Sequence, residues 1–143
     1  MEWMLMPLKR YADFSGRSRR QEYWLFVLFT LLVYLACLVV LIAVVGFEAG
    51  AMEPKPDDVP AAGLITIMLF VLVYLGLFIP TLAVKVRRFH DQDLSGWFVL
   101  LGFIPYLGWL IMFIFMCIDG TPGPNRFGPD PQGRGETHAN IFA

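Results

Sequence analysis

Three long runs without charge set the main constraint on this chain. Residues 23–47, 61–84 and 97–118 contain no Asp, Glu, Lys or Arg, and each exceeds the roughly 18 residues of a candidate transmembrane helix. As a helix rising about 1.5 Å per residue, each run could reach across a hydrocarbon core of roughly 30 Å. Only 16% of the residues are charged, against roughly 25% in soluble domains. The sequence therefore predicts an all-α integral membrane protein, a small helical bundle of three spanning segments.

The third run leaves two arrangements open. Its centre holds Gly102, Pro105 and Gly108, a spacing that fits one kinked helix or a re-entrant pair of short helices. The length favours one kinked span, which gives three crossings. The pair would make a fourth segment, and the chain would leave the membrane on the side from which it entered. In the second run, Pro80 predicts a kink or a helix end.

The charged residues are segregated in the connections between these runs. Residues 1–22 and 85–96 are basic and contain Lys9, Arg10, Arg17, Arg19, Arg20, Lys85, Arg87 and Arg88. The connection 48–60 is acidic and contains Glu48, Glu53, Asp57 and Asp58 against a single Lys55. Because Lys and Arg near span ends favour the cytoplasmic side, we predict a cytoplasmic N-terminus and loop 85–96, and an outer acidic connection. One third span would place the C-terminus outside, and a pair would keep it inside.

The two ends of the chain predict different structures. Residues 1–14 mix aromatic and apolar side chains with Lys9 and Arg10, which is typical of a helix at the membrane interface, although a frayed terminus is the alternative. Ser18 and Gln21 match a capping box, so the first spanning helix should start near Ser18. Residues from 119 onward are rich in Gly and Pro and predict turns. We expect residues 1–131 to form a single membrane domain and residues 132–143 a flexible extension.

Three segments carry a family resemblance. They read FSGRSRRQEYW at 14–24, LAVKVRRFHDQDLSGWFVLLGFIPYLGW at 82–109, and DGTPGPNRFGPDP at 119–131. Together they resemble the YhaH-type bacterial inner membrane proteins, the domain-of-unknown-function 805 (DUF 805) family. The resemblance extends from about residue 8 to residue 131 and implies a small multi-pass protein of the bacterial cytoplasmic (inner) membrane. It implies no reaction and no cofactor. This chain departs from the pattern in its longer acidic connection and in the extension after residue 131.

The segment VKVRRFHDQDLSGW at 84–97 invites a catalytic interpretation. His90 can transfer protons near neutral pH, and Asp91 lies beside it, so these two residues are the catalytic candidates. A metal site is not expected, because His-Asp-x-Asp lacks the i, i+4 spacing that aims two ligands at one point.

A structural interpretation of the same segment is the plainer one. Its basic residues would set the orientation of the chain and contact anionic headgroups, while His90 would hydrogen-bond within the turn. Asp91 or Asp93 would cap a helix beginning near Ser95, or pair with an arginine.

A third interpretation joins the two. The predicted topology places Glu22 and the loop aspartates on the same side as the arginines, so they can form an ion-pair clasp that also holds a lipid headgroup, a phosphate or a partner. A cytoplasmic tail would let Arg126 and Asp130 join. The residues assigned to this lipid, anion or partner site are Arg17, Arg20, Glu22, Arg87, Arg88, His90, Asp91, Asn125 and Arg126.

Three functions follow from these patterns. The leading hypothesis is a non-enzymatic membrane protein that interacts with membrane lipids, with a second copy or with another membrane protein, and uses neither cofactor nor nucleic acid. The second is a membrane enzyme that acts on a lipid-linked or phosphorylated substrate through His90 and Asp91. The third, a small transporter or channel, rests only on the Gly-Pro-Gly break and is disfavoured because the spans lack internal charge.

Overall fold

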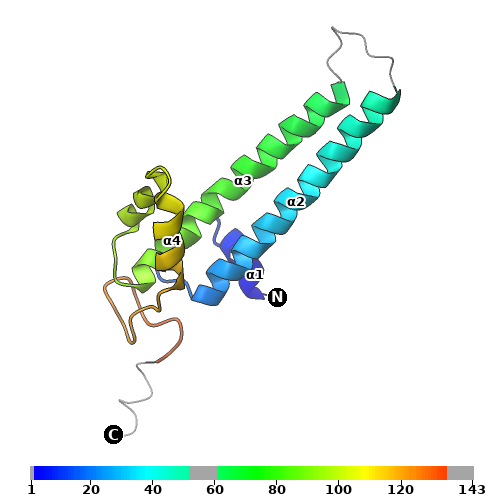
Figure 1. Ribbon diagram of the computed structural model, residues 1–143. Helices are drawn as coiled ribbons and strands as arrows, with labels where there is room; N and C mark the ends of the chain where they lie inside the picture. The colour runs from blue at the N-terminus through cyan, green and yellow to red at the C-terminus, as the bar shows by residue number, and fades with distance from the viewer. Residues whose placement is uncertain (1, 52–60, 135–143) are drawn as a thin grey trace, which may run out of the picture. The chain divides into compact units, whose positions relative to one another are not determined.

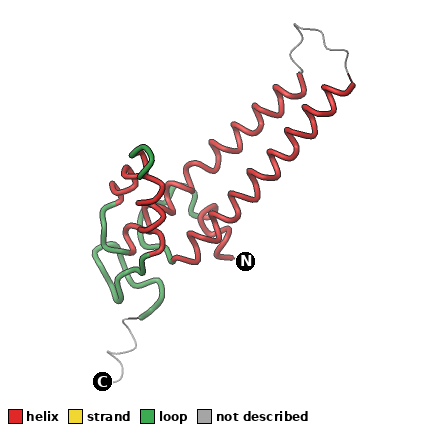
Figure 2. The backbone as a smooth tube through the Cα atoms, viewed as in Figure 1, coloured by secondary structure: helices red, strands yellow, loops and turns green. Residues whose placement is uncertain are grey.

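Helices joined by loops make up the structure, a computed structural model that describes residues 2–51 and 61–134. The elements are α1 (Glu2–Lys9), α2 (Arg20–Ala51), α3 (Ala61–Asp91), the 3₁₀ helix η1 (Gly96–Phe103) and α4 (Gly108–Cys117) (Figure 1). Within the described ranges no segment forms a strand, as Figure 2 shows. The predicted all-α class is confirmed. Most of the predicted acidic connection, at residues 52–60, lies outside the described residues.

The chain divides into two compact units, which we describe separately. The first unit comprises Met1–Val27 and Ile79–Ala143, and the second comprises Leu28–Phe78. In the second unit the ring of Tyr34 on α2 packs against Phe70 and Tyr74 on α3, with centroid distances of 6.1 and 6.0 Å. Large apolar side chains elsewhere on these helix segments are exposed, with Leu31 at 59%. Such a surface favours lipid over water.

Both long helices are long and apolar enough to cross a membrane. α2 has 32 residues and α3 has 31, which correspond to about 45–50 Å at about 1.5 Å per residue. α3 continues through Pro80 to Asp91, so the predicted helix end at this proline and the predicted loop from residue 85 are wrong. The basic residues of that segment instead form the last turns of α3, where positive charge stabilises the negative end of the helix dipole.

The third apolar run folds as a helical pair. η1 has eight residues and α4 has ten, which correspond to about 15 Å each, so neither reaches across a hydrocarbon core of roughly 30 Å. A Cβ on Gly108 would lie 2.5 Å from the carbonyl oxygen of Gly102, so this glycine allows the two short helices to touch. Of the two arrangements that the sequence leaves open, the structure therefore has the pair and not the single kinked helix.

The N-terminal segment forms the predicted helix, and α2 starts close to the expected position. α1 covers Glu2–Lys9 with Pro7 inside it. α2 begins at Arg20, two residues after Ser18. The Ser18 hydroxyl accepts a hydrogen bond from Arg87 Nε at 3.0 Å, a long-range contact that a capping-box pattern does not predict.

Candidate functional site

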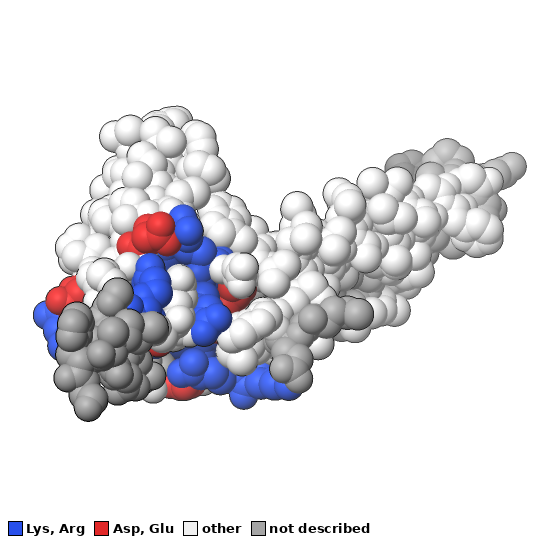
Figure 3. Space-filling view, turned by 90° about the horizontal axis from the view of Figure 1, so that it is seen from below, with Lys and Arg blue, Asp and Glu red and all other residues white. Residues whose placement is uncertain are grey.

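The first unit brings the three family-like segments to one charged face. Residues 13–22, the C-terminal turns of α3 and the chain between residues 117 and 134 all meet there through side-chain contacts. Figure 3 shows Lys and Arg side chains gathered on this face with Asp and Glu among them. We call the buried part of this arrangement the clasp, which consists of Arg17, Glu22, Arg87, Arg88, Asp91 and Asp130.

Asp91 is the centre of the clasp, and its side chain is 0% exposed. Arg17 Nε donates to Asp91 Oδ1 at 2.9 Å, and Arg88 Nη1 donates to Asp91 Oδ2 from one turn earlier on α3. The backbone carbonyl of Asp91 accepts from the backbone N–H of Thr121 at 2.9 Å. Asp91 therefore joins all three segments at one residue.

Arg17 is the main link between the N-terminal segment and the tail. Besides Asp91, its guanidinium donates to the carbonyl oxygens of Thr121 at 2.6 Å and Gly123 at 2.7 Å. Asp130 Oδ1 lies 3.8 Å from Arg17 Nη2. The planar guanidinium fork can contact several acceptors at once, which a lysine could not match.

Arg87 fastens the N-terminal segment to α3. It donates to Ser18 Oγ at 3.0 Å, to the Asp13 carbonyl at 3.1 Å and to Glu22 Oε1 at 3.2 Å. The Arg87 carbonyl accepts from the backbone N–H of Ser18 at 3.2 Å. Arg87 and Glu22 are both almost fully buried, so the pair is shielded from water.

The clasp is electrically balanced, because its three buried arginines face three buried carboxylates. Moving an ion out of water costs several kcal/mol, and burial is tolerated only where partners satisfy the charge. Backbone carbonyl oxygens accept further hydrogen bonds from these arginines. One of them is the Ile118 carbonyl, which accepts from Arg88 Nη2. Arg88 Nε is a buried donor with no partner among the described residues, but the clasp uses most of its other hydrogen-bonding capacity within the protein.

The tail is attached to the end of α3 by a tight turn. Asn125 Nδ2 donates to the His90 carbonyl at 2.9 Å, and Asn125 exchanges backbone hydrogen bonds with Gly128 at 3.0 Å. Gly128 has a φ of 135°, a left-handed conformation that a glycine adopts easily. Gly120 lies against Asp91 so closely that a Cβ there would meet Asp91 Oδ2 at 2.0 Å.

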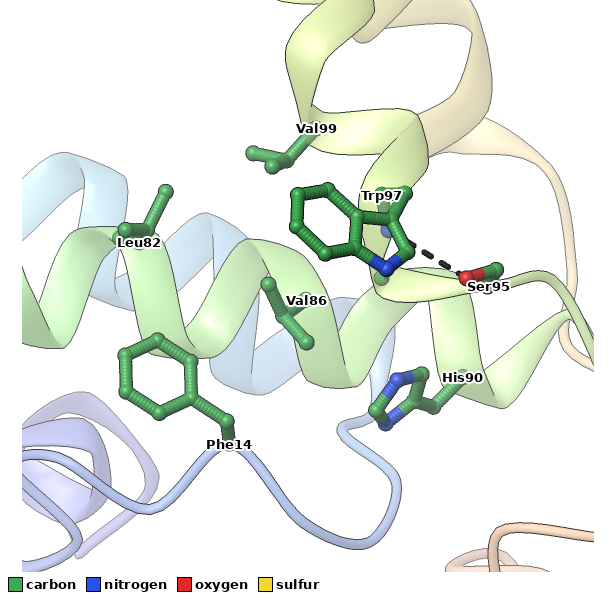
Figure 4. Close-up of a pocket in the computed structure, with 8 residues that line it drawn as sticks. Phe14, Leu82, Val86, His90, Ser95, Trp97 and Val99 are labelled. Atoms are coloured by element: carbon green, nitrogen blue, oxygen red, sulfur yellow. Dashed lines mark hydrogen bonds between the residues drawn. The ribbon is translucent and has the colours of Figure 1, made fainter.

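The side chains of His90 and Asp91 have different partners. The His90 ring stacks on Phe127 at a centroid distance of 3.8 Å, and its Nδ1 lies 3.2 Å from the Gly16 carbonyl oxygen. Asp91 is directed into the clasp. The other side of the His90 ring helps to line an apolar pocket of about 440 Å³, which Figure 4 shows with Phe14, Val86 and Trp97. The prediction that His90 hydrogen-bonds within its own turn is wrong, because the ring instead reaches the N-terminal segment.

More exposed ion pairs surround the clasp. Arg20 pairs with Asp119 at 2.8 Å, and Arg126 pairs with Asp93 at 3.1 Å, with exposed fractions between 45% and 60%. Pairs as exposed as these contribute roughly 0–1 kcal/mol and exchange partners easily. Ser95, and neither aspartate, caps η1, since its side chain accepts from the backbone N–H of Trp97.

The predicted site residues thus fall into two groups. Arg17, Glu22, Arg87, Arg88 and Asp91 are buried in the clasp, so the predicted ion pairing is confirmed, while Arg20 and Arg126 stay exposed. Asn125 holds the tail, and its binding role remains a prediction. The site also includes Ser18, Gly120, Thr121 and Arg134, which were not predicted. Gly120 lies in the family-like tail segment, which is the one signal that could have indicated it.

Acid should weaken the tail contact at Asp130. Burial raises the pKa of Asp130, but hydrogen bonds from the Arg134 side chain and from the backbone of Gln132 and Arg134 outweigh it and lower the pKa to about 2. Because the folded pKa lies below the usual 3.8, this stabilisation is complete above about pH 4 and is lost as the pH falls towards 2.

This is tested with Asp130→Asn. The free energy of unfolding of the wild type and of this variant is measured at pH 6 and at pH 3. The wild type should lose more stability than the variant between pH 6 and pH 3, by roughly 1 kcal/mol at about 1.4 kcal/mol per pKa unit. The Ser15 and Arg10 hydrogen bonds also lower the pKa of Asp13, but that effect is common to both proteins and cancels in the difference. Equal losses in the two proteins would contradict the assignment.

Comparison with known proteins gives one family and two kinds of relative. A family model described as "Protein of unknown function (DUF805)" matches residues 11–129. The chain is 42% identical to the inner membrane protein YhaH of Escherichia coli (strain K12), over 92% of this chain and 98% of the relative. It is 41% identical to the inner membrane protein YhaI of the same strain, over 92% of this chain and 97% of the relative. No solved structure gives a significant match.

Proposed function

The chain belongs to the DUF805 family, whose relatives include inner membrane proteins, and from this premise we propose a non-enzymatic, lipid-binding role. The protein crosses the inner membrane with α2 and α3 and places its charged face on the cytoplasmic side. This face binds the headgroups of anionic phospholipids. The clasp holds the face together, and the more exposed cations around it make the lipid contacts.

One observation carries the proposal, namely that the clasp is closed while the basic residues around it are accessible. Every carboxylate of the clasp lies within 4 Å of an arginine, so the clasp is structural and has little free capacity for a ligand. Lys9, Arg20 and Arg126 remain exposed. Cations at a membrane surface attract anionic lipid with about 1 kcal/mol each.

The helical pair supports the proposed orientation. Neither η1 nor α4 is long enough to cross, so the chain that enters this pair at residue 96 leaves it on the same side. The clasp then requires residues 13–22, the end of α3 and the tail to lie on one side of the membrane. The excess of Lys and Arg in these segments assigns that side to the cytoplasm.

The buried position of Asp91 argues against the enzyme hypothesis. A general base must reach the proton that it removes, and a carboxylate held by Arg17 and Arg88 is not accessible. His90 is engaged by Gly16 and Phe127. Self-association and a partner protein remain predictions for the exposed apolar helix surfaces.

The proposal is tested by the affinity of the purified protein for short-chain phosphatidylglycerol in zwitterionic micelles. Lys9→Gln should weaken binding about fivefold, which corresponds to about 1 kcal/mol, and added salt should shrink this difference. Lys55→Gln is the matched control, because it removes the same charge from the predicted outer connection. An equal effect of the two variants, or no preference for phosphatidylglycerol over phosphatidylcholine, would contradict the proposed role.

A further inference from the structure

A polar pocket lies at the beginning of α2, separate from the clasp and from the apolar pocket. It has a volume of about 300 Å³ and is lined by Arg19, Arg20, Gln21 and Gln132. Two cationic side chains and two amide side chains thus meet where the N-terminal segment and the tail come together. Among the described residues that line it, none carries a carboxylate. The pocket therefore offers hydrogen-bond donors and positive charge, a combination that fits an anion.

Arg19 has a donor that the protein leaves unused. Its Nε is buried, and no hydrogen-bond partner for it is found among the described residues. The guanidinium lies over the ring of Trp3, 4.9 Å from the centroid, which fixes its position. A buried donor without a partner costs about 1–3 kcal/mol, so an anion that draws the Arg19 side chain towards the pocket and accepts from Nε would recover this free energy.

Arg20 provides a second cation that can change partner at little cost. Its guanidinium pairs with Asp119 at 2.8 Å and donates to the Cys117 carbonyl at 3.2 Å, but both charged side chains are largely exposed. An exposed pair of this kind is worth roughly 0–1 kcal/mol. An incoming anion can therefore share Arg20 with Asp119 without disturbing the clasp.

The position of the pocket at the start of α2 also favours binding of an anion. Arg20 and Gln21 are the first residues of α2, and the first backbone N–H groups of a helix have no partner within it. These N–H groups and the helix dipole favour negative charge at this end, and phosphate is a common ligand there. The pocket volume is large enough for a phosphate group with part of its substituent.

We infer that this pocket binds one phosphate group, carried by an anionic lipid headgroup or free in solution. The inference rests on the proposed function, because it assigns a specific site to the lipid-binding face. The charge-free run of α2 begins at residue 23, directly after the pocket, so the proposed orientation places the pocket at headgroup depth. Arginine forks and amide donors together recognise the oxygen atoms of phosphate.

The test measures binding to the full chain in zwitterionic micelles by calorimetry and by ³¹P NMR of the probe. The probes are short-chain phosphatidylglycerol and inorganic phosphate, each titrated separately. We expect one saturable site, weakened at least tenfold by Arg19→Gln combined with Arg20→Gln. Gln132→Glu is the second variant, since it puts a carboxylate into the pocket from the exposed tail without altering α2, and it should weaken binding to a similar extent. Lys55→Gln, which removes a positive charge from the predicted outer connection, should change binding less than twofold.

The outcomes distinguish a lipid headgroup from free phosphate as the source of the phosphate group. They also distinguish a failure of this inference from a failure of the proposed function. Saturable binding of the lipid alone assigns a headgroup, and binding of both probes assigns the phosphate group itself. Binding of inorganic phosphate alone supports the pocket but removes the lipid as its source. No saturable binding, or binding that Gln132→Glu leaves unchanged, overturns the inference. The effect of Lys9→Gln on phosphatidylglycerol tests the wider lipid-binding face independently of this pocket.

Discussion

Replacing Asp91 by asparagine is expected to lower the free energy of unfolding by about 3–5 kcal/mol, the range found when one partner of a buried ion pair is removed. The asparagine would leave Arg88 buried without its carboxylate partner and Arg17 with only Asp130, 3.8 Å away. Unfolding can be followed in mixed micelles with increasing SDS by the fluorescence of the four tryptophans, of which Trp24 packs on Phe113 at 5.5 Å within the first unit.

The control for this variant is Asp93→Asn, two residues further along the chain. Asp93 is 47% exposed and pairs with Arg126, which is 60% exposed, so its loss should cost no more than about 1 kcal/mol. The two variants make the same chemical change in the same segment. Similar costs for both would mean that the clasp is not a buried network.

Gly120→Ala is expected to destabilise the protein by roughly 3 kcal/mol, although it adds only one methyl group. The new Cβ would lie 2.0 Å from Asp91 Oδ2, so either the tail or the carboxylate must move. Overpacking of a rigid site costs about 1–3 kcal/mol, and displacement of Asp91 adds the loss of its ion pairs. The same SDS titration measures the change.

Gly76→Ala provides the comparison for this substitution. Gly76 lies inside α3 with no atom within 4 Å of an added Cβ. Alanine there should leave stability unchanged or raise it by about 0.5–1 kcal/mol through its better helix propensity. If Gly120→Ala also proved neutral, the close approach of the tail to Asp91 would be refuted.

The fold was predictable where composition alone decides it. A charge-free run of more than 20 residues has few alternatives to a long helix, and α2 and α3 contain the first two runs. The third run could not be decided from its sequence, because Gly102, Pro105 and Gly108 fit a kink as well as a turn. The choice depends on the contact between Gly102 and Gly108, which brings two short helices together. The end of α3 was misplaced because Pro80 and the basic residues resemble a loop signal.

The pairing of charges in the site was also predictable, but its burial was not. Segregation of Lys and Arg along the chain places the arginines and acids on one side, which was enough to expect a clasp. Burial depends on backbone carbonyls from Thr121, Gly123 and Ile118, which accept from Arg17 and Arg88. Every residue has a backbone carbonyl, so no sequence pattern shows which carbonyl accepts a hydrogen bond from a given arginine. Ser18 was assigned to a local cap because its actual partner, Arg87, lies 69 positions away and no local pattern indicates it.

The side of the membrane on which the C-terminus lies tests the account most directly. A topology reporter fused after Ala143, active only in the cytoplasm, can be paired with one that is active only outside it. The clasp and the short helices α4 and η1 predict cytoplasmic activity, with the tail on the same side as the N-terminus. Activity outside would mean that the chain between α3 and the tail crosses the membrane, which would separate Asp91 from Thr121 and contradict the clasp.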